Sequence, residues 1–249
     1  MAKIELRKGD CLELMKDIED NSIDMILCDL PYGTTACKWD TIIDFKLLWK
    51  QYERIIKDNG AIVLTASQPF TSALVMSNLK IFKYSWVWNK VLHSNPLIAK
   101  KQPLNAHEDI IVFYKKQCIY NPQMTEGKII KRGKFNTGKS QSKGLANLHR
   151  GEDSSKKRYP VRIITFSNAD KTNISHPTQK PVALFEYLIK TYTNENDLVL
   201  DNCAGSGTTG VACQNLNRNC ILMEKDQEYC DIIEKRLKEN KSLKDYTNN

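Results

Sequence analysis

The sequence predicts an α/β protein with a doubly wound, mostly parallel sheet, and three observations support this prediction. Short apolar segments typical of strands alternate with segments of helical periodicity along most of the 249 residues. Hydrophobic residues make up 41% of the chain, enough for a sizeable core. Two predicted strands end in polar turns, Cys28–Gly33 and Asp201–Gly210. Open α/β sheets bind ligands at such carboxyl ends of strands.

The first part of the chain is expected to alternate strands with helices. Strands are predicted at Lys3–Leu6, Asp24–Cys28, Ala61–Leu64, Tyr84–Val91 and Asp109–Tyr114. Apolar residues at helical spacing predict helices at Leu12–Met15, Phe45–Ile56 and Pro69–Met76. The pair Asn59-Gly60 is expected to end the second helix, because glycine commonly closes helices.

The periodicity stops at Lys115 and returns near Pro181. The segment between them is polar and rich in Lys, Gly, Ser and Asn. After it, the pattern predicts helices at Pro181–Ile189, Gly210–Gln214 and Tyr229–Leu237, with strands at Leu198–Leu200 and Cys220–Met223. We therefore expect a first sheet-forming half at 1–114, an insert at 115–175 and a second half at 176–249.

The net charge of +8 is concentrated in the insert. Residues 115–175 hold 14 Lys and Arg against 4 Asp and Glu, so the rest of the chain is slightly acidic. A local basic block is typical of a surface that binds phosphates, and a solvated basic loop is the simpler alternative. The candidate phosphate-binding residues are Lys131, Arg132, Lys134, Lys139, Lys156, Lys157, Arg158 and Arg162.

Composition also limits the class of protein. No apolar stretch reaches the roughly 18 residues that a membrane-spanning helix needs, and the first residues lack the apolar region of a signal peptide. The eight cysteines form no C-x-x-C pair, and the four histidines form no ligand cluster by spacing. We therefore expect a soluble cytoplasmic protein without membrane contact, disulfides or metal.

The turn Asp201–Gly210 is typical of a loop that binds a nucleoside-type cofactor. Gly205 and Gly207 let the backbone turn sharply, and Thr208 then opens a helix. The next strand ends at Glu224, 19 positions after Gly205, where an acidic residue suits ribose hydroxyls. The third glycine of the dinucleotide pattern is missing, which favours a smaller nucleoside ligand. An ordinary strand–turn–helix junction is the simpler alternative.

The turn Asp29-Leu30-Pro31-Tyr32 offers two acceptors and an aromatic ring. The Asp29 carboxylate and the Pro31 carbonyl can together accept both hydrogens of an amine. Tyr32 can stack on a flat ring. This combination suits the exocyclic amine of a nucleobase. By itself, such a tetrapeptide is more often a plain turn.

The order of these motifs resembles that of the permuted, beta-type DNA amino-methyltransferases of the N6-adenine and N4-cytosine family. The resemblance rests on Asp29–Tyr32, the basic insert, His176–Pro181, Asp201–Thr209 and Glu224, in that order. Two departures stand out. Leu30 replaces the first proline of the usual Pro-Pro, and Asn202-Cys203 replaces the usual Pro-Phe.

The resemblance implies a Rossmann-like sheet of seven strands with one reversed, circularly permuted motif order and S-adenosylmethionine as cofactor. The catalytic residues would be Asp29, Pro31 and Tyr32. The residues around the cofactor would be Asp10, Cys11, Asp29, Thr178, Lys180, Asp201, Gly205, Ser206, Gly207, Thr208 and Glu224.

The implied activity is site-specific methylation of adenine N6 in double-stranded DNA. The target base would flip out, stack on Tyr32 and present its amine for direct displacement. Asp at the first turn position resembles the adenine enzymes, and N4-cytosine methylation is the alternative. The resemblance implies a cytoplasmic protein that is bacterial or phage-encoded, and it leaves open a homodimer and a cognate restriction endonuclease.

Other readings of the sequence are weaker. Gly133–Ser140 matches the P-loop expression, but no buried strand precedes it and a Gly- and Ser-rich stretch follows. A protein-glutamine methyltransferase would also grip an amide, but usually with the cofactor loop first. A catalytically silent DNA-binding protein would not need both turns. The pair His107-Glu108 is expected to be structural, and the four tryptophans are expected in the core, with Trp88 the candidate exception.

Overall fold

The computed structural model describes residues 2–35, 40–94, 96–127, 156–168 and 179–247, and the chain divides into two compact units. The first unit comprises Met1–Asn121 and Arg162–Asn249, and the second comprises Pro122–Val161. The second unit is shorter than the expected insert because both flanks of the insert join the first unit. The Asn121 amide donates to the Thr191 carbonyl at 2.7 Å, and residues after Arg162 extend the sheet.

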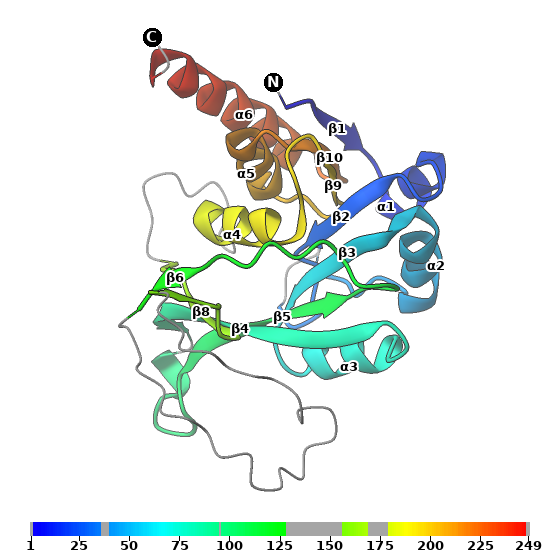
Figure 1. Cartoon of the computed structure of the whole chain (residues 1–249). Helices are drawn as coiled ribbons and strands as arrows, with labels where there is room; N and C mark the ends of the chain where they lie inside the picture. Colours follow the sequence, from blue (N-terminus) through cyan, green and yellow to red (C-terminus); the bar gives the residue numbers. More distant parts are fainter. Residues whose placement is uncertain (1, 36–39, 95, 128–155, 169–178, 248–249) are drawn as a thin grey trace, which may run out of the picture. The chain divides into compact units, whose positions relative to one another are not determined.

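Within the described residues, the sheet of the first unit has eight strands in the order β1-β10-β9-β2-β3-β5-β4-β8 (Figure 1). Their bounds are β1 Ile4–Lys8, β2 Ile23–Cys28, β3 Ile56–Ala66, β4 Phe82–Ser94, β5 Asn105–Phe113, β8 Ile163–Thr165, β9 Leu198–Asp201 and β10 Asn219–Glu224. The expected single reversed strand is confirmed, since β5 runs antiparallel to both β3 and β4.

The predicted count of seven strands was wrong by one. The eighth strand, β8, lies in the polar segment that we assigned wholly to the insert, and it pairs in parallel with β4 at the edge of the sheet. Its central residue, Ile164, is buried, whereas Ile163 and Thr165 are exposed. A three-residue strand with one inward side chain carries too little periodicity to be recognised in the sequence.

Helices cover both faces of the sheet (Figure 1). One face carries α1 Cys11–Leu14, the 3₁₀ turn Met15–Asp17, α2 Phe45–Ile55 and α3 Phe70–Ser77, and the other carries α4 Val182–Tyr192, α5 Thr208–Leu216 and α6 Gln227–Thr247. Neighbouring side chains of β2 alternate between the two cores, with Ile26 on the α2 side and Leu27 on the α4 side. Because both faces are buried, the strand reads as a continuous apolar run.

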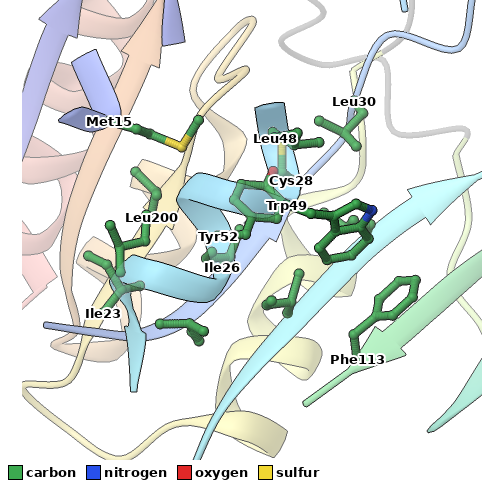
Figure 2. Packing of buried hydrophobic residues seen from close by; sticks show 14 of the residues in the cluster. Met15, Ile23, Ile26, Cys28, Leu30, Leu48, Trp49, Tyr52, Phe113 and Leu200 are labelled. Carbon is green, nitrogen blue, oxygen red and sulfur yellow. The ribbon is translucent and has the colours of Figure 1, made fainter. Parts of the chain in front are cut away.

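The core on the α2 side is packed around aromatic rings (Figure 2). Trp49 lies between Tyr52 and Phe113, with ring centroids 5.7 and 4.8 Å away, respectively. Its indole N–H donates to the Ser77 hydroxyl at 2.7 Å, so the buried ring leaves no orphaned donor. Trp49, Trp86 and Trp88 are all buried, as the sequence predicts, and Trp39 lies outside the described residues.

The expected role of Asn59-Gly60 as a helix stop was wrong. Helix α2 ends at Ile55, and Asn59-Gly60 lies inside β3. A Cβ on Gly60 would come within 2.8 Å of the Asp24 carbonyl on the neighbouring strand. The β2–β3 register shifts at this point, so glycine is needed for a close approach of two strands.

The second unit contains a short two-stranded ladder. Strand β6, Thr125–Glu126, pairs antiparallel with β7, Lys157–Arg158, and the Gly127 amide donates to the Lys156 carbonyl at 2.7 Å. In the first unit, a 3₁₀ turn at Pro96–Ile98 lies between β4 and β5. No helix in the described part of the chain is both long enough and apolar enough to cross a membrane.

The topology brings several chain segments to one edge of the sheet. Strands β1, β2, β9 and β10 end there and are followed by Gly9, Asp29, Asn202 and Lys225. Because β5 runs in the opposite direction, its beginning, near Glu108, lies at the same edge. This edge is the place where an open α/β sheet binds ligands.

Candidate active site

One cleft runs along this edge of the sheet. It has a volume of about 1790 Å³, and both Tyr32 of the first polar turn and Gly205 of the second line it. The strand ends predicted this meeting of the two turns, which are far apart in the sequence. One part of the cleft is lined by the loops after β1, β9 and β10, and another by the loop after β2 together with the facing parts of β4 and β5.

The loop after β9 has the conformation that its glycines predict. Gly205 and Gly207 have φ values of +51° and +79°, in the left-handed region that favours glycine. A Cβ on Gly207 would come within 2.9 Å of the Ile233 side chain, so the loop also packs closely on α6. On Gly205 a Cβ would meet no described atom within 4 Å, which leaves open space beside the loop.

Glu224, at the end of β10, connects this loop to the next one. Its Oε2 accepts from the Gly205 amide at 2.8 Å. Its Oε1 accepts from the amides of Lys225 and Asp226 at 2.8 and 2.9 Å. Backbone donors therefore fix the carboxylate at the cleft wall. Each carboxylate oxygen can accept more than one hydrogen bond, so acceptor capacity remains for hydroxyl groups.

Asp201 is buried at the base of the same loop. Burial raises the pKa of this carboxyl to about 6, although hydrogen bonds from the Thr209 hydroxyl and the Cys203 amide oppose the rise. The carboxyl is therefore mostly ionised at neutral pH and becomes protonated as the pH falls through about 6. Nearby, Arg236 of α6 donates to the Ser206 carbonyl and hydroxyl and holds the loop.

Asn202, which stands where the family usually has proline, makes a buried hydrogen bond. The Asn202 side chain is buried, and its Oδ1 accepts a hydrogen bond from the Tyr52 hydroxyl of α2. Burial raises the pKa of Tyr52 well above its usual range, so the hydroxyl stays protonated and donates. A proline at position 202 would leave this buried hydroxyl without its acceptor.

The Tyr52–Asn202 bond predicts a stability effect. Tyr52→Phe should lower the free energy of unfolding by about 1–3 kcal/mol, because the buried Asn202 oxygen loses its donor. Urea denaturation measures this change. Tyr114→Phe is the matched control, since the Tyr114 hydroxyl contacts Gln117 at 3.3 Å in an exposed setting. Equal losses in the two variants would contradict this assignment.

Three thiols lie close together next to the loop after β9. Cys203 contacts both Cys11 and Cys28. Burial raises the pKa of the Cys28 thiol to about 12. The pKa of the Cys11 thiol lies far above its usual range, chiefly because of its contact with Cys203 and, second, because of burial. The seven cysteines in the described part are all free. These thiols stay protonated, so they are poor nucleophiles.

The turn Asp29–Tyr32 holds Asp29 in a network of donors. Its Oδ1 accepts from the Tyr32 hydroxyl at 2.7 Å and from the Thr65 hydroxyl of β3. Its Oδ2 accepts from Lys180 Nζ at 2.6 Å, just before α4 begins. The carboxylate is thus oriented by donors from its own turn, from β3 and from the segment before α4. Burial and the charge of Asp29 raise the pKa of Tyr32 well above its usual range, so Tyr32 remains a donor.

The resemblance implies that Lys180 contacts the cofactor, and the structure places its ammonium between two carboxylates. Besides Asp29 at 2.6 Å, Glu108 Oε2 lies 3.4 Å from Lys180 Nζ. Burial lowers the pKa of Lys180, but these two carboxylates outweigh it and raise the pKa above its usual range. On its other oxygen, Glu108 pairs with Lys90 Nζ at 3.2 Å.

Sequence reasoning missed Glu108, Thr65 and Lys90. Glu108 was expected to be structural with His107, and it lines the cleft instead. The reversed direction of β5 explains this error, because it brings the beginning of that strand to the edge where the other strands end. An acidic residue at the beginning of a strand before Ile110–Phe113 is the only signal that could have indicated it.

Tyr32 has a different environment from the one expected. Its ring stacks on Phe70, with centroids 5.1 Å apart and planes inclined by 23°. Lys180 Nζ lies 5.7 Å from the Tyr32 ring centroid. One ring face is therefore occupied by the protein, and stacking on a base stays a prediction for the other face. Pro31 lines the cleft next to it.

The remaining predicted residues fall into three groups. Asp10, Cys11, Ser206 and Thr208 line the cleft. Asp10 also caps α1, since its Oδ1 accepts from the Leu12 amide at 2.9 Å. Lys156, Lys157 and Arg158 lie in the second unit, and Arg162 lies over the Tyr84 ring. Those outside the described residues are Thr178, Lys131, Arg132, Lys134, Lys139 and the P-loop-like segment 133–140.

Known proteins resemble this chain over most of its length. A family model described as DNA methylase matches residues 23–235. The type II methyltransferase M.HpaI of Haemophilus parainfluenzae is 28% identical over 92% of this chain and 72% of its own length. M.HinfI of Haemophilus influenzae is 30% identical over 94% of this chain and 68% of its own length.

Solved structures give the same picture. The M1.HpyAVI–SAM complex is 27% identical, covers 94% of this chain and 98% of its own, and superposes with a TM-score of 0.65. The cytosine-N4-specific PvuII DNA methyltransferase, 18% identical, shares the fold with a TM-score of 0.65, over 92% of this chain and 84% of its own. With the family model covering most of the sequence, this chain belongs to the N6-adenine and N4-cytosine DNA methyltransferase family.

Proposed function

We propose that this protein transfers a methyl group from S-adenosylmethionine to the exocyclic N6 of a specific adenine in double-stranded DNA. Family membership supports DNA methylation as the activity. The choice of adenine rests on Asp29 at the first position of the turn, where the sequence resembles the adenine enzymes. The observation that carries the proposal is the single cleft lined by both Asp29 and the Gly205 loop.

The residues of the cleft fit S-adenosylmethionine. Glu224, fixed by three backbone amides, would accept the ribose hydroxyls. The loop at Gly205 and Gly207 leaves room for the ligand, and the Asp201 carboxylate favours a cation nearby. Asp10 and Cys11 would lie by the adenine ring. When bound, the donor supplies an electrophilic methyl group on a sulfonium.

The residues of the turn would bind and orient the target amine. The amine lone pair of a nucleobase is delocalised into the ring, so it is a weak nucleophile. Asp29 and the Pro31 carbonyl would each accept one amine hydrogen and favour the pyramidal, positively charged nitrogen that develops during transfer. As the bond from nitrogen to the methyl carbon forms, the bond from that carbon to sulfur breaks, the neutral thioether S-adenosylhomocysteine leaves, and the nitrogen releases one proton. Tyr32 and Thr65 hold the carboxylate in place for this task. No cysteine nucleophile is required, in keeping with the protonated thiols.

The titration of Asp201 predicts a pH dependence of donor binding. Above a pH of about 6 the carboxylate is charged and attracts the sulfonium, and below that pH protonation removes the attraction. The dissociation constant of the donor, measured by calorimetry from pH 5 to 8, should therefore rise as the pH falls through about 6. Asp201→Asn should flatten this profile. An unchanged profile in Asp201→Asn would assign the titration to another group.

The second unit would contribute contacts to DNA phosphates. Its described basic residues are Lys156, Lys157 and Arg158, and the basic composition of 115–175 points the same way. Replacing all three with Ala should make the slope of log affinity against log salt shallower by about 2–3, since each phosphate contact contributes about 0.9. Affinity measurements between low and physiological salt test this. A slope equal to that of the wild type would show that these three residues do not contact DNA phosphates.

Nucleoside analysis tests the proposed function. The protein is incubated with methyl-labelled donor and unmethylated DNA of mixed sequence, and the DNA is digested to nucleosides. N6-methyladenine is the expected product. N4-methylcytosine would support the alternative base, and unlabelled DNA would refute methyl transfer altogether. Labelled fragments of the same DNA, mapped before digestion, would separately identify the recognition site.

A further inference from the structure

The Asp29 carboxylate poses a problem for the proposed transfer, because a lysine already occupies it. Lys180 Nζ lies 2.6 Å from Asp29 Oδ2, and the Lys180 side chain is only 8% exposed. The target amine gains positive charge as the methyl group arrives. An ammonium held on the same carboxylate would oppose that charge at close range, where the local dielectric constant is low.

Glu108 offers Lys180 a second place to bind. Its Oε2 lies 3.4 Å from Lys180 Nζ, is buried, and makes no hydrogen bond to any described residue. Buried carboxylate oxygens are normally hydrogen-bonded. The Glu108 oxygen lies slightly too far from the Lys180 ammonium for a good hydrogen bond, and this separation needs an explanation. A small movement of the flexible lysine would satisfy it.

The charges around the two carboxylates balance in this arrangement. Asp29 and Glu108 face Lys180 and Lys90, with Lys90 Nζ 3.2 Å from Glu108 Oε1. Lys180 could therefore leave Asp29 without becoming an unpaired buried charge, which would be strongly unfavourable. Thr65 and Tyr32 would still hold Asp29 Oδ1.

We propose that Glu108 is a positioning residue that takes Lys180 from Asp29 when the target amine binds, so that the full charge of Asp29 faces the reacting nitrogen. This inference rests on the proposed function. Glu108 acts through Lys180 and forms no bond with the donor. Its place on the α4 side of β5, opposite to its neighbour Asp109, allows this contact: Asp109 accepts from Thr71 of α3 on the other face.

Glu108→Gln tests the proposal, with Asp109→Asn as the matched loss of charge on the same strand. Glu108→Gln should lower kcat at least about 30-fold, while the donor dissociation constant and the KM for DNA stay within threefold. Asp109→Asn should keep kcat within threefold of the wild type. An unchanged kcat in Glu108→Gln, or a loss confined to binding, would overturn the proposal.

A second variant and a double-mutant cycle complete the test. Glu108→Asp keeps the negative charge but draws the carboxylate back from both Lys180 and Lys90, so kcat should fall at least about tenfold. This variant keeps the proposal testable if Glu108→Gln does not fold. In a Lys180→Met background, Glu108→Gln should change the single-turnover rate less than threefold. A full further loss there would show that Glu108 acts independently of Lys180. If the wild type itself transfers no methyl group, the proposed function fails instead.

Discussion

Asp29→Ala is expected to lower kcat by about 10²–10³-fold while the donor dissociation constant changes less than about threefold. Removing a preorganised group that stabilises developing charge typically costs this much. Asp29 is fixed by three donors, from its own turn, from β3 and from the segment before α4, and none of them belongs to the Gly205 loop or to the end of β10 at Glu224. Transfer and donor binding should therefore separate in this variant.

Single-turnover kinetics and calorimetry measure the two effects. The loss of Asp29 leaves Lys180 with Glu108 as its neighbouring carboxylate, and thermal unfolding shows whether the variant stays folded. Asp231→Ala removes an exposed carboxylate on α6 and serves as the control for the charge change. Equal losses in kcat and donor affinity would contradict a role of Asp29 at the target amine.

Glu224→Gln is expected to weaken donor binding by about 30–100-fold. Hydrogen bonds to a charged group are worth about 1.5–3 kcal/mol, and the ribose would lose such an acceptor. An amide at this position would also direct its NH₂ group toward backbone donors on one side, either the Gly205 amide or the amides of Lys225 and Asp226. The loop around the donor would lose its anchor as well.

The control for this change is Glu228→Gln, in the first turn of α6, where the side chain is exposed. Calorimetry with S-adenosylmethionine measures both variants. At saturating donor, Glu224→Gln should recover much of the wild-type turnover, because Asp29 and its partners are untouched. A donor affinity within threefold of the wild type would show that Glu224 does not bind the donor.

The strands and their carboxyl ends could be predicted from the sequence because both faces of the sheet are buried. Such strands read as short apolar runs, and the turns after β2 and β9 contain the polar residues, Asp29 and Gly205 among them. The parallel arrangement then brings these turns together at one edge. The permuted motif order stays a prediction that follows from the same sequence pattern.

The partners of Asp29 could not be predicted in the same way. Thr65 ends an apolar strand and resembles a core residue, and Glu108 belongs to the reversed strand β5. The pairing of Tyr52 with Asn202 joins positions 150 residues apart. Such contacts depend on strand direction and helix placement, which local patterns do not specify. Gly60 was misread for the same reason, since its close neighbour is Asp24 on β2.

A structure of the protein with a non-reactive donor analogue and a duplex containing the mapped site tests the account most directly. We expect a flipped base whose amine lies within hydrogen-bond distance of Asp29 and the Pro31 carbonyl, with the analogue's ribose on Glu224. A target base bound outside the cleft, or an analogue bound away from the Gly205 loop, would contradict it.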